Sequence, residues 1–246
     1  MNERRCGIMI NEIPFGNFPI LLGQAGMDFI LIDCEHGGFD YREVYTMTSA
    51  SKAFGKTETI IRLSSNRRRD IIKFLDMGAD SLLLPMTNGA DDIKEVVRYA
   101  KYSPLGERGI STMRAHTLYD PPVLTEYMRT ANEHTKVYAQ IETVSGVEHI
   151  EEILATEGVA GFFLGPNDLS DSYHCLTDPA APEILSAIEK TAEAARKFNK
   201  LSGIITANET YLKQAKRCGV KMFCKGSELS VLKSGAKKIV KELLED

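Results

Sequence analysis

The chain has little cysteine and no long apolar run. Its 246 residues hold five cysteines, an odd number with no Cys-x-x-Cys pair, which argues against a disulfide framework and favours a reduced, cytoplasmic protein. No apolar stretch approaches the roughly 20 residues that a membrane span needs. Residues 1–16 lack a sustained apolar core and a small-residue cleavage site, so we expect no signal peptide.

The chain also lacks an excess of basic charge, a flexible linker and a dinucleotide-binding motif. A net charge of −4 and a pI near 5.8 argue against a general nucleic-acid binder. Proline, glycine and serine are scattered singly, and no Gly-x-Gly-x-x-Gly follows the first expected strand, which counts against a Rossmann fold. The length is close to the roughly 250 residues of one (β/α)8 barrel, so we expect a single domain over residues 1–246.

Short apolar segments alternate with helical patterns along the whole chain. The expected strands cover residues 6–10, 28–33, 58–63, 81–84, 136–142, 160–164, 201–205 and 220–224. Such uniformly apolar strands between helices are typical of parallel strands that are covered on both faces. Eight of them predict a closed TIM barrel rather than an open doubly wound sheet.

Several of these strands end on polar residues of the kinds that catalysis uses. At or just after the strand ends stand Asp33, Glu35, His36, Arg62, Gln140, Glu142 and Asp168. In a parallel barrel the carboxyl ends of all the strands meet on one rim, where such barrels carry their chemistry. Two carboxylates, a histidine and an arginine on one rim indicate a metal-assisted lyase site.

Glu142 and Asp168 follow consecutive strands, so we expect their carboxylates to be neighbours. Close carboxylates repel unless they are protonated, paired or bridged by a cation, and oxygen ligands with open water positions suit Mg²⁺ or Mn²⁺. The alternative is that one caps the following helix while the other pairs with an arginine.

His36 follows Asp33 by three residues. A carboxylate bonded to one ring nitrogen would fix the tautomer and raise the basicity of the other nitrogen, although a histidine held by backbone in a turn is the plainer interpretation. Arg62 either pairs with a carboxylate of the protein or binds one from a substrate.

Three further features have weaker functional interpretations. The turn at Gly165 and Pro166 could expose backbone N–H groups to an anion or could be only a tight turn. Arg67–Arg69 could form a solvated face or reach a distal substrate group. Lys225, placed directly after the last expected strand, could form a Schiff base but is more often a surface lysine.

The chain resembles the HpcH/HpaI aldolase family, the metal-dependent (class II) aldolases that cleave 4-hydroxy-2-oxo acids. The resemblance runs from about residue 6 to the C-terminus. It rests on seven motifs in the family's order: DFILIDCEHG, IIRL, KFLDMGADSLLLPM, YSPLGERG, AQIET, GFFLGPNDLS and GSELSVL.

The resemblance implies a role for each site residue. Glu142 and Asp168 would bind the divalent metal, with Mg²⁺, Mn²⁺ or Co²⁺ as candidates. His36 would be the base, oriented by Asp33, and Arg62 would hold the pyruvate carboxylate or the enolate oxygen. Gln140 would line the same site, and the backbone at Gly165 and Pro166 would receive the substrate carboxylate. The products would be pyruvate and an aldehyde, and a homohexamer that exchanges C-terminal helices is implied.

The chain departs from the family pattern at four places around the expected mouth. Cys34 stands where the family usually has glycine, and its side chain could crowd the His36 loop. Glu228 replaces an aspartate, Lys225 a small apolar residue, and Arg67–Arg69 a glycine-containing loop. The alternatives are oxaloacetate decarboxylation or a related lyase reaction at the same enolate site, a Schiff-base aldolase through Lys225, and a barrel that has lost catalysis and only binds a ligand.

Overall fold

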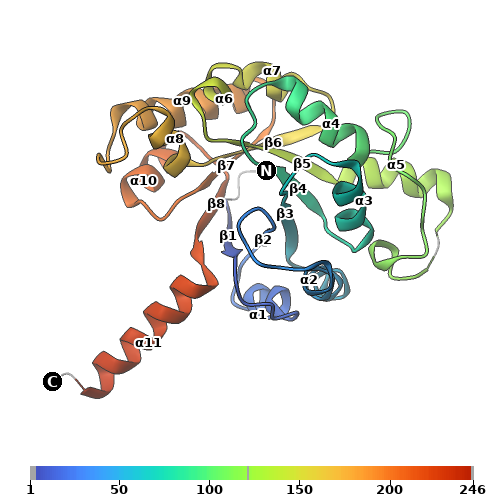
Figure 1. The fold of residues 1–246 in the computed structure, drawn as a ribbon, viewed down its shortest axis with the longest axis horizontal. Helices are drawn as coiled ribbons and strands as arrows, with labels where there is room; N and C mark the ends of the chain where they lie inside the picture. The colour runs from blue at the N-terminus through green and yellow to red at the C-terminus, as the bar shows by residue number, and fades with distance from the viewer. Residues whose placement is uncertain (1–3, 121, 245–246) are drawn as a thin grey trace.

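Eight parallel strands close a barrel in chain order, and helices surround it (Figure 1). The computed structural model describes residues 4–120 and 122–244. The strands are β1 (Arg5–Ile10), β2 (Phe29–Asp33), β3 (Glu58–Arg62), β4 (Ser81–Leu84), β5 (Lys136–Ile141), β6 (Val159–Leu164), β7 (Leu201–Ile205) and β8 (Met222–Ser227). This confirms the predicted (β/α)8 barrel.

Helices follow the strands, and two extra short helices lie after β5 and β6. They are α1 (Phe18–Gln24), α2 (Tyr41–Phe54), α3 (Arg68–Asp76), α4 (Ala90–Ala100), α5 (Leu124–His134), α6 (Val144–Glu148), α7 (Ile150–Ala155), α8 (Pro166–Ser172), α9 (Pro182–Lys197), α10 (Glu209–Arg217) and α11 (Glu228–Leu244), with a 3₁₀ turn at Ala115–Thr117. Among the described residues, no helix has the length and apolar content to cross a membrane.

Alternation along each strand decides which side chains face the barrel axis. The interior is filled by a separate apolar cluster: Phe29, Leu31, Ile60, Leu83, Tyr138, Phe163, Met222 and Cys224. Successive strand residues point to opposite faces, so Asp33 continues the inward series of Phe29 and Leu31. Gln140 and Glu142 likewise continue the series of Tyr138. The pattern therefore carries polar side chains from the filled interior to the open mouth.

Seven of the eight strands lie within one residue of their expected bounds, and β8 differs more. Strand β8 begins at Met222 and runs to Ser227, so the expected end at Cys224 was wrong and Lys225 lies inside the strand. Helix α8 has Pro166 in its first turn, so the turn at Gly165 and Pro166 leads directly into a short helix. Proline is well suited to the start of a helix because its missing N–H has no partner there in any case.

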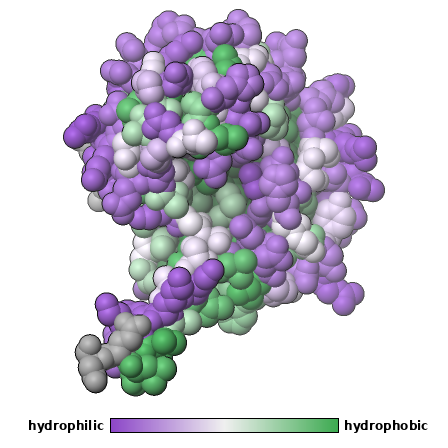
Figure 2. All heavy atoms as spheres, turned by 60° about the vertical axis from the view of Figure 1, so that its left-hand side comes forward, coloured by the Kyte–Doolittle hydropathy of each residue, from purple (hydrophilic) through white to green (hydrophobic). Residues whose placement is uncertain are grey.

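The C-terminal helix α11 leaves the barrel instead of covering β8 (Figure 1). Of its residues only Glu228, at the base, is buried. Its exposed large apolar side chains are Leu229, Val231, Leu232, Ile239, Val240, Leu243 and Leu244. Figure 2 shows this apolar surface on the projecting arm. In proteins most of the stability of a helix comes from the packing of its apolar face, so α11 presents a face that needs a partner.

Candidate active site

A cavity of about 470 Å³ opens at the carboxyl ends of the strands. Its lining includes five of the residues that the sequence singled out: His36, Arg62, Gln140, Gly165 and Asp168. Asp33 and Glu142 lie below the surface of the cavity, each with only 2% of its area exposed. The barrel thus brings together side chains that are up to 135 positions apart, from Asp33 to Asp168.

Asp33 and Arg62 form a two-pronged ion pair. They are register partners on β2 and β3, and the Arg62 Nε and Nη2 groups donate to the two Asp33 oxygens at 2.9 and 2.6 Å. Burial by itself would raise the pKa of Asp33, but the hydrogen bonds and charge of Arg62 outweigh it and hold that pKa below its usual value. Asp33 is therefore ionised at neutral pH and orients the guanidinium of Arg62.

Asp33 does not contact the His36 ring, contrary to the expected orienting pair. Its Oδ1 accepts the main-chain N–H groups of Glu35 and His36 at 3.0 and 3.2 Å, so it shapes the loop rather than the ring. The His36 side chain is 74% exposed, and its Nε2 lies 3.8 Å from a carboxylate oxygen of Glu35. Asp33 positions His36 through its backbone, and Glu35 is the acidic neighbour of the ring.

Glu35 bridges the histidine and the arginine. Its carboxylate lies 3.3 Å from Arg62 Nη1. Burial raises the pKa of Glu35, and the charges of Arg62 and His36 oppose that rise while those of Asp33 and Asp168 add to it. The sequence placed Glu35 near the rim but gave it no role. Its spacing two residues after Asp33 was the available signal.

Glu142 is a buried carboxylate that forms no ion pair with a side chain in the described part of the protein. Its Oε1 accepts the main-chain N–H of Met86 at 2.6 Å, and its Oε2 accepts Gln140 Nε2. Burial raises the pKa of Glu142 to about 7. The Met86 hydrogen bond and the charge of Arg62 oppose this rise, and the negative charges of Asp168 and Glu35 add to it. A divalent cation between Glu142 and Asp168 would remove that repulsion, so the electrostatics fit a metal.

The shape of the site fits a bound ion as well. The side-chain oxygen of Gln140 is buried and has no partner among the described residues. At Gly165 an added Cβ would lie 2.9 Å from Glu142 Oε2 and 3.2 Å from Gln140 Nε2, so only glycine leaves that space open. The described residues hold no group of three or more His, Cys, Asp or Glu placed to bind a metal. Two carboxylates would therefore leave several positions for substrate and water, as Mg²⁺ prefers.

A family model described as HpcH/HpaI aldolase/citrate lyase matches residues 20–232. The chain belongs to this family. It is 34% identical over 216 residues to the 4-hydroxy-2-oxo-heptane-1,7-dioate aldolase of Escherichia coli strain ATCC 8739, covering 88% of this chain and 82% of the relative. It is 30% identical over 219 residues to the 5-keto-4-deoxy-D-glucarate aldolase of Klebsiella pneumoniae, covering 89% and 84%.

A solved HpcH/HpaI aldolase from Desulfitobacterium hafniense superposes with a TM-score of 0.92 at 29% identity. The match covers 100% of this chain and 94% of that one. As a member of the HpcH/HpaI family, the chain is a carbon–carbon lyase.

Cys34, unusual for the HpcH/HpaI pattern, does not crowd the site. Its N–H bonds to the Arg62 carbonyl at 3.0 Å, and its side chain lines a separate cavity with Phe39, Tyr41 and Phe74. Burial, with a smaller contribution from the charge of Asp33, raises the pKa of its thiol to about 12. Cys34 is thus a neutral packing residue behind the β2–α2 loop.

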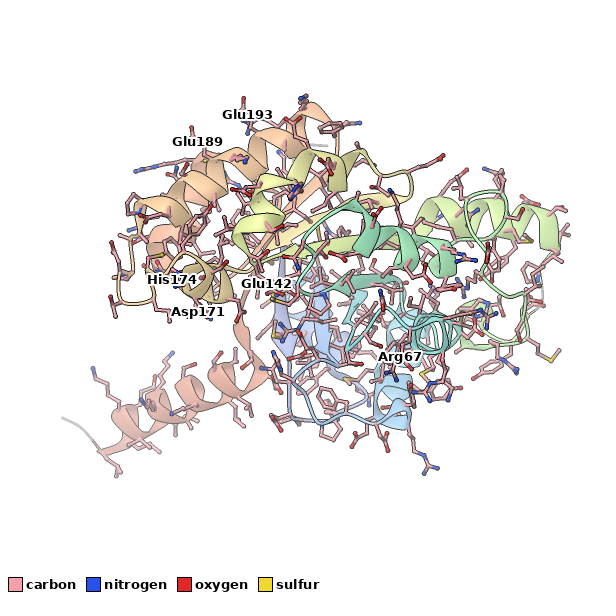
Figure 3. All side chains as sticks on the ribbon, turned by 45° about the horizontal axis from the view of Figure 1, so that its top comes forward. Arg67, Glu142, Asp171, His174, Glu189 and Glu193 are labelled. Atoms are coloured by element: carbon pink, nitrogen blue, oxygen red, sulfur yellow. The ribbon has the colours of Figure 1, made fainter. Side chains whose placement is uncertain are left out.

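The basic residues that depart from the HpcH/HpaI pattern do not line the cavity. Lys225 follows the inward Cys224 on β8, points outward and lies 3.6 Å from Glu209 on α10. Arg67, labelled in Figure 3 next to the start of α3, lies apart from Glu142. Arg69 pairs with Asp70 at 3.0 Å. The placement of Lys225 argues against a Schiff base, and the arginines form a solvated face.

The cavity also has a wall that the sequence reading did not find. Strands β1, β7 and β8 and the start of α11 contribute Met9, Asn11, Ile205, Thr206, Ala207, Gly226, Ser227 and Ser230, while Asn167 comes from α8. The charged residues at the ends of β1 and β8, which are Glu12, Lys225 and Glu228, do not line the cavity. The only signal in the sequence was the alternation of side chains along each strand. Asn11 follows the inward-facing Met9 by two residues, so it lies on the same side.

Proposed function

We propose that this protein is a class II aldolase that cleaves a 4-hydroxy-2-oxo acid to pyruvate and an aldehyde. The observation that supports this most directly is that one cavity brings together Arg62, Glu142 and Asp168. The Arg62 guanidinium is held in place by Asp33, and the negative charge of Asp168 raises the pKa of Glu142. That arrangement suits a substrate whose 2-oxo group becomes negatively charged as the carbon–carbon bond breaks.

We assign Glu142 and Asp168 to a divalent metal, with Mg²⁺, Mn²⁺ or Co²⁺ as candidates. When bound, the metal would hold the 2-oxo acid and polarise its carbonyl. Gln140 fixes one oxygen of Glu142 and lines the same site. The missing side chain at Gly165 leaves room beside that oxygen, and the main chain at Gly165 and Pro166 borders the place for the substrate carboxylate.

His36 and Arg62 carry the proton and charge changes in this proposal. The exposed His36 ring stands at the rim, where it takes the proton from the 4-hydroxyl group as the C3–C4 bond breaks. Arg62 is already held in place by Asp33 and stabilises the enolate oxygen without further reorganisation. A proton returned to C3 then gives pyruvate.

The test measures pyruvate release from a racemic 4-hydroxy-2-oxo acid, first with EDTA and then with added Mg²⁺ or Mn²⁺. Activity should vanish with chelator and return with metal. Glu142→Gln and Asp168→Asn should each lower kcat/KM by on the order of 100-fold or more. The matched control is Asp171→Asn, which makes the same charge change on an exposed residue of α8 (Figure 3) and should retain activity.

The same assay separates the alternatives. With oxaloacetate offered in parallel, release of carbon dioxide and pyruvate from it, without aldehyde release from the 4-hydroxy-2-oxo acid, would identify a decarboxylase that uses the same enolate site. Activity that survives EDTA together with borohydride trapping of pyruvate would contradict the proposal and favour a lysine mechanism. No pyruvate under any condition would favour a barrel that only binds ligands.

We also propose that the protein is a homohexamer in which α11 packs on a neighbouring copy. The support is the row of exposed apolar side chains on α11, which leaves the barrel (Figures 1 and 2). Light scattering should give about six times the 27.3 kDa chain mass. Leu232→Glu should reduce that mass, whereas Lys233→Glu, one residue along, should not.

We further propose a cytoplasmic location and a single domain over residues 1–246. The five cysteines, all in the described part of the chain, are free thiols, as expected of a reducing compartment. All eight strands belong to one barrel, which supports one folding unit.

A further inference from the structure

The mouth of the barrel has a charged side and an uncharged side. The charged side is built by β2, β3, β5 and the start of α8, which supply Asp33, Arg62, Glu142 and Asp168. The uncharged side is built by β1, β7, β8 and the first turn of α11, which supply Met9, Asn11, Ile205, Thr206, Ala207, Ser227 and Ser230. If the pyruvate part of the substrate occupies the charged side, the aldehyde part extends toward the uncharged side.

The uncharged side offers no cation for a second carboxylate. Among the described residues that line the cavity, only His36 and Arg62 are basic, and both belong to the charged side. Arg62 is engaged by Asp33 and Glu35. Lys225 directly follows the inward Cys224 on β8, so it points outward, toward Glu209. A carboxylated aldehyde would therefore lose its hydration without gaining an ion pair.

Asn11 is one of the polar residues on this side, with Thr206, Ser227 and Ser230. Its side-chain oxygen is buried and has no hydrogen-bond partner among the described residues. The Ser230 hydroxyl, in contrast, already accepts the N–H of Ser227 at 2.9 Å and donates to its carbonyl at 2.7 Å. An amide has both donors and an acceptor, which matches a hydroxyl group that can also donate and accept.

Glu228 holds Asn11 in place. One oxygen of this buried carboxylate accepts three consecutive main-chain N–H groups, those of Asn11, Glu12 and Ile13, at 2.9, 2.7 and 3.1 Å. The loop after β1 is thus fixed to the base of α11. Glu228, which departs from the family's aspartate, is a positioning residue for the wall that carries Asn11.

We propose that the aldehyde subsite of this enzyme takes a short, uncharged, hydroxylated aldehyde, with Asn11 as its hydroxyl-binding residue. This inference rests on the proposed aldolase function and names its acceptor class. It separates this chain from the relative whose name specifies a heptane-1,7-dioate, a substrate with a second carboxylate.

The test runs the reaction in the synthetic direction with the assembled protein and Mg²⁺. Pyruvate gives up a C3 proton, its enolate carbon bonds to the aldehyde carbon, and the aldehyde oxygen takes up a proton. We compare kcat/KM for glyceraldehyde, propanal and succinate semialdehyde. Glyceraldehyde should exceed both others by about tenfold or more. A preference for succinate semialdehyde would overturn the inference, because a cation would then have to reach the mouth.

Two variants probe the assigned wall. Asn11→Ala should lower the ratio of glyceraldehyde to propanal activity by about fivefold, the effect of one neutral hydrogen bond. Ser230→Arg should raise the relative use of succinate semialdehyde, whereas Ser234→Arg, one turn along α11 and outside the cavity lining, should not. An unchanged ratio in Asn11→Ala would remove that residue from the subsite.

Glu228→Gln separates positioning from a purely structural role. It should raise KM for glyceraldehyde more than it lowers kcat, whereas simple destabilisation would lower active-enzyme concentration and kcat alone. Exchange of the pyruvate C3 protons in D₂O requires only the enolate machinery. If the pyruvate C3 protons exchange but glyceraldehyde is not the preferred aldehyde, the subsite proposal alone is refuted. If the C3 protons do not exchange, the aldolase proposal itself is refuted.

Discussion

Replacing Asp33 by asparagine removes one charge from the ion pair that aims Arg62. The side chains of Asp33 and Arg62 are 3% and 9% exposed, so the arginine would keep its charge in a poorly hydrated place. Loss of one member of a buried pair costs more than the pair itself contributes, because the remaining charge loses its closest partner. In Asp33→Asn only Glu35, 3.3 Å from Arg62 Nη1, would remain beside the arginine. We expect Asp33→Asn to lower the free energy of unfolding by about 3 kcal/mol.

The assay is urea unfolding at fixed protein concentration, since an oligomer's midpoint depends on concentration. Arg62→Met removes the other charge, and the double variant removes both. The double variant should be more stable than the sum of the single effects predicts, by about 2 kcal/mol. Asp91→Asn is the control, because its partner Lys94 and Asp91 itself are mostly exposed, and it should leave the midpoint unchanged. Additive costs for Asp33 and Arg62 would refute the reasoning.

The same pair predicts a pH dependence. The pKa of Asp33 in the folded protein lies below its usual value, so the folded state favours the ionised form. Its contribution to stability is therefore present above the unfolded-state pKa of about 3.9 and is lost as the pH falls through the lower folded-state pKa. Asp33→Asn should have a shallower loss of stability in this acid range than the natural chain. An identical pH dependence would contradict the assignment.

Three further predictions concern other parts of the barrel. Gly165→Ala should weaken Mn²⁺ binding about tenfold or more in titration calorimetry while the protein stays folded, because its Cβ would crowd Glu142 Oε2 at 2.9 Å; unchanged affinity would move the metal elsewhere. Lys225→Ala should retain pyruvate release, and the natural chain should not be trapped by borohydride, because Lys225 points outward to Glu209. Glu58→Gln should flatten the acid unfolding profile. Burial opposes ionisation of Glu58, but the charges of Lys136 and Arg5, together with the hydrogen bonds from Ser81 and Lys136, outweigh burial and lower the Glu58 pKa. The contribution of Glu58 to stability is therefore lost as pH falls through that lowered pKa. A profile as steep as that of the natural chain would contradict it.

The departures from the family pattern show where sequence reasoning is limited. Cys34 was interpreted as a side chain that could crowd the His36 loop, but it occupies an outward position and lines a separate cavity with Phe39 and Phe74. Lys225 was placed after the last strand, but β8 continues to Ser227. Both errors concern the face on which a side chain lies. A shift of one residue reverses that face in a strand, and sequence-based strand boundaries are less accurate than one residue.

The sequence by itself determined the barrel and which charged residues lie together at its rim. Eight apolar segments separated by helices leave few arrangements other than parallel strands covered on both sides. The polar residues that end those strands must then meet on one rim, which brings Arg62 and Glu142 near each other.

Only the tertiary structure decided how these side chains pair. The sequence allowed Asp33 to bind either the His36 ring or Arg62. The strand register places Asp33 opposite Arg62, so the carboxylate pairs with the arginine. The role of Asn11 was equally hidden, since it depends on Glu228, 217 positions away in the chain. Local sequence fixes the period of each strand, but contacts across the barrel depend on distances that only the closed fold defines.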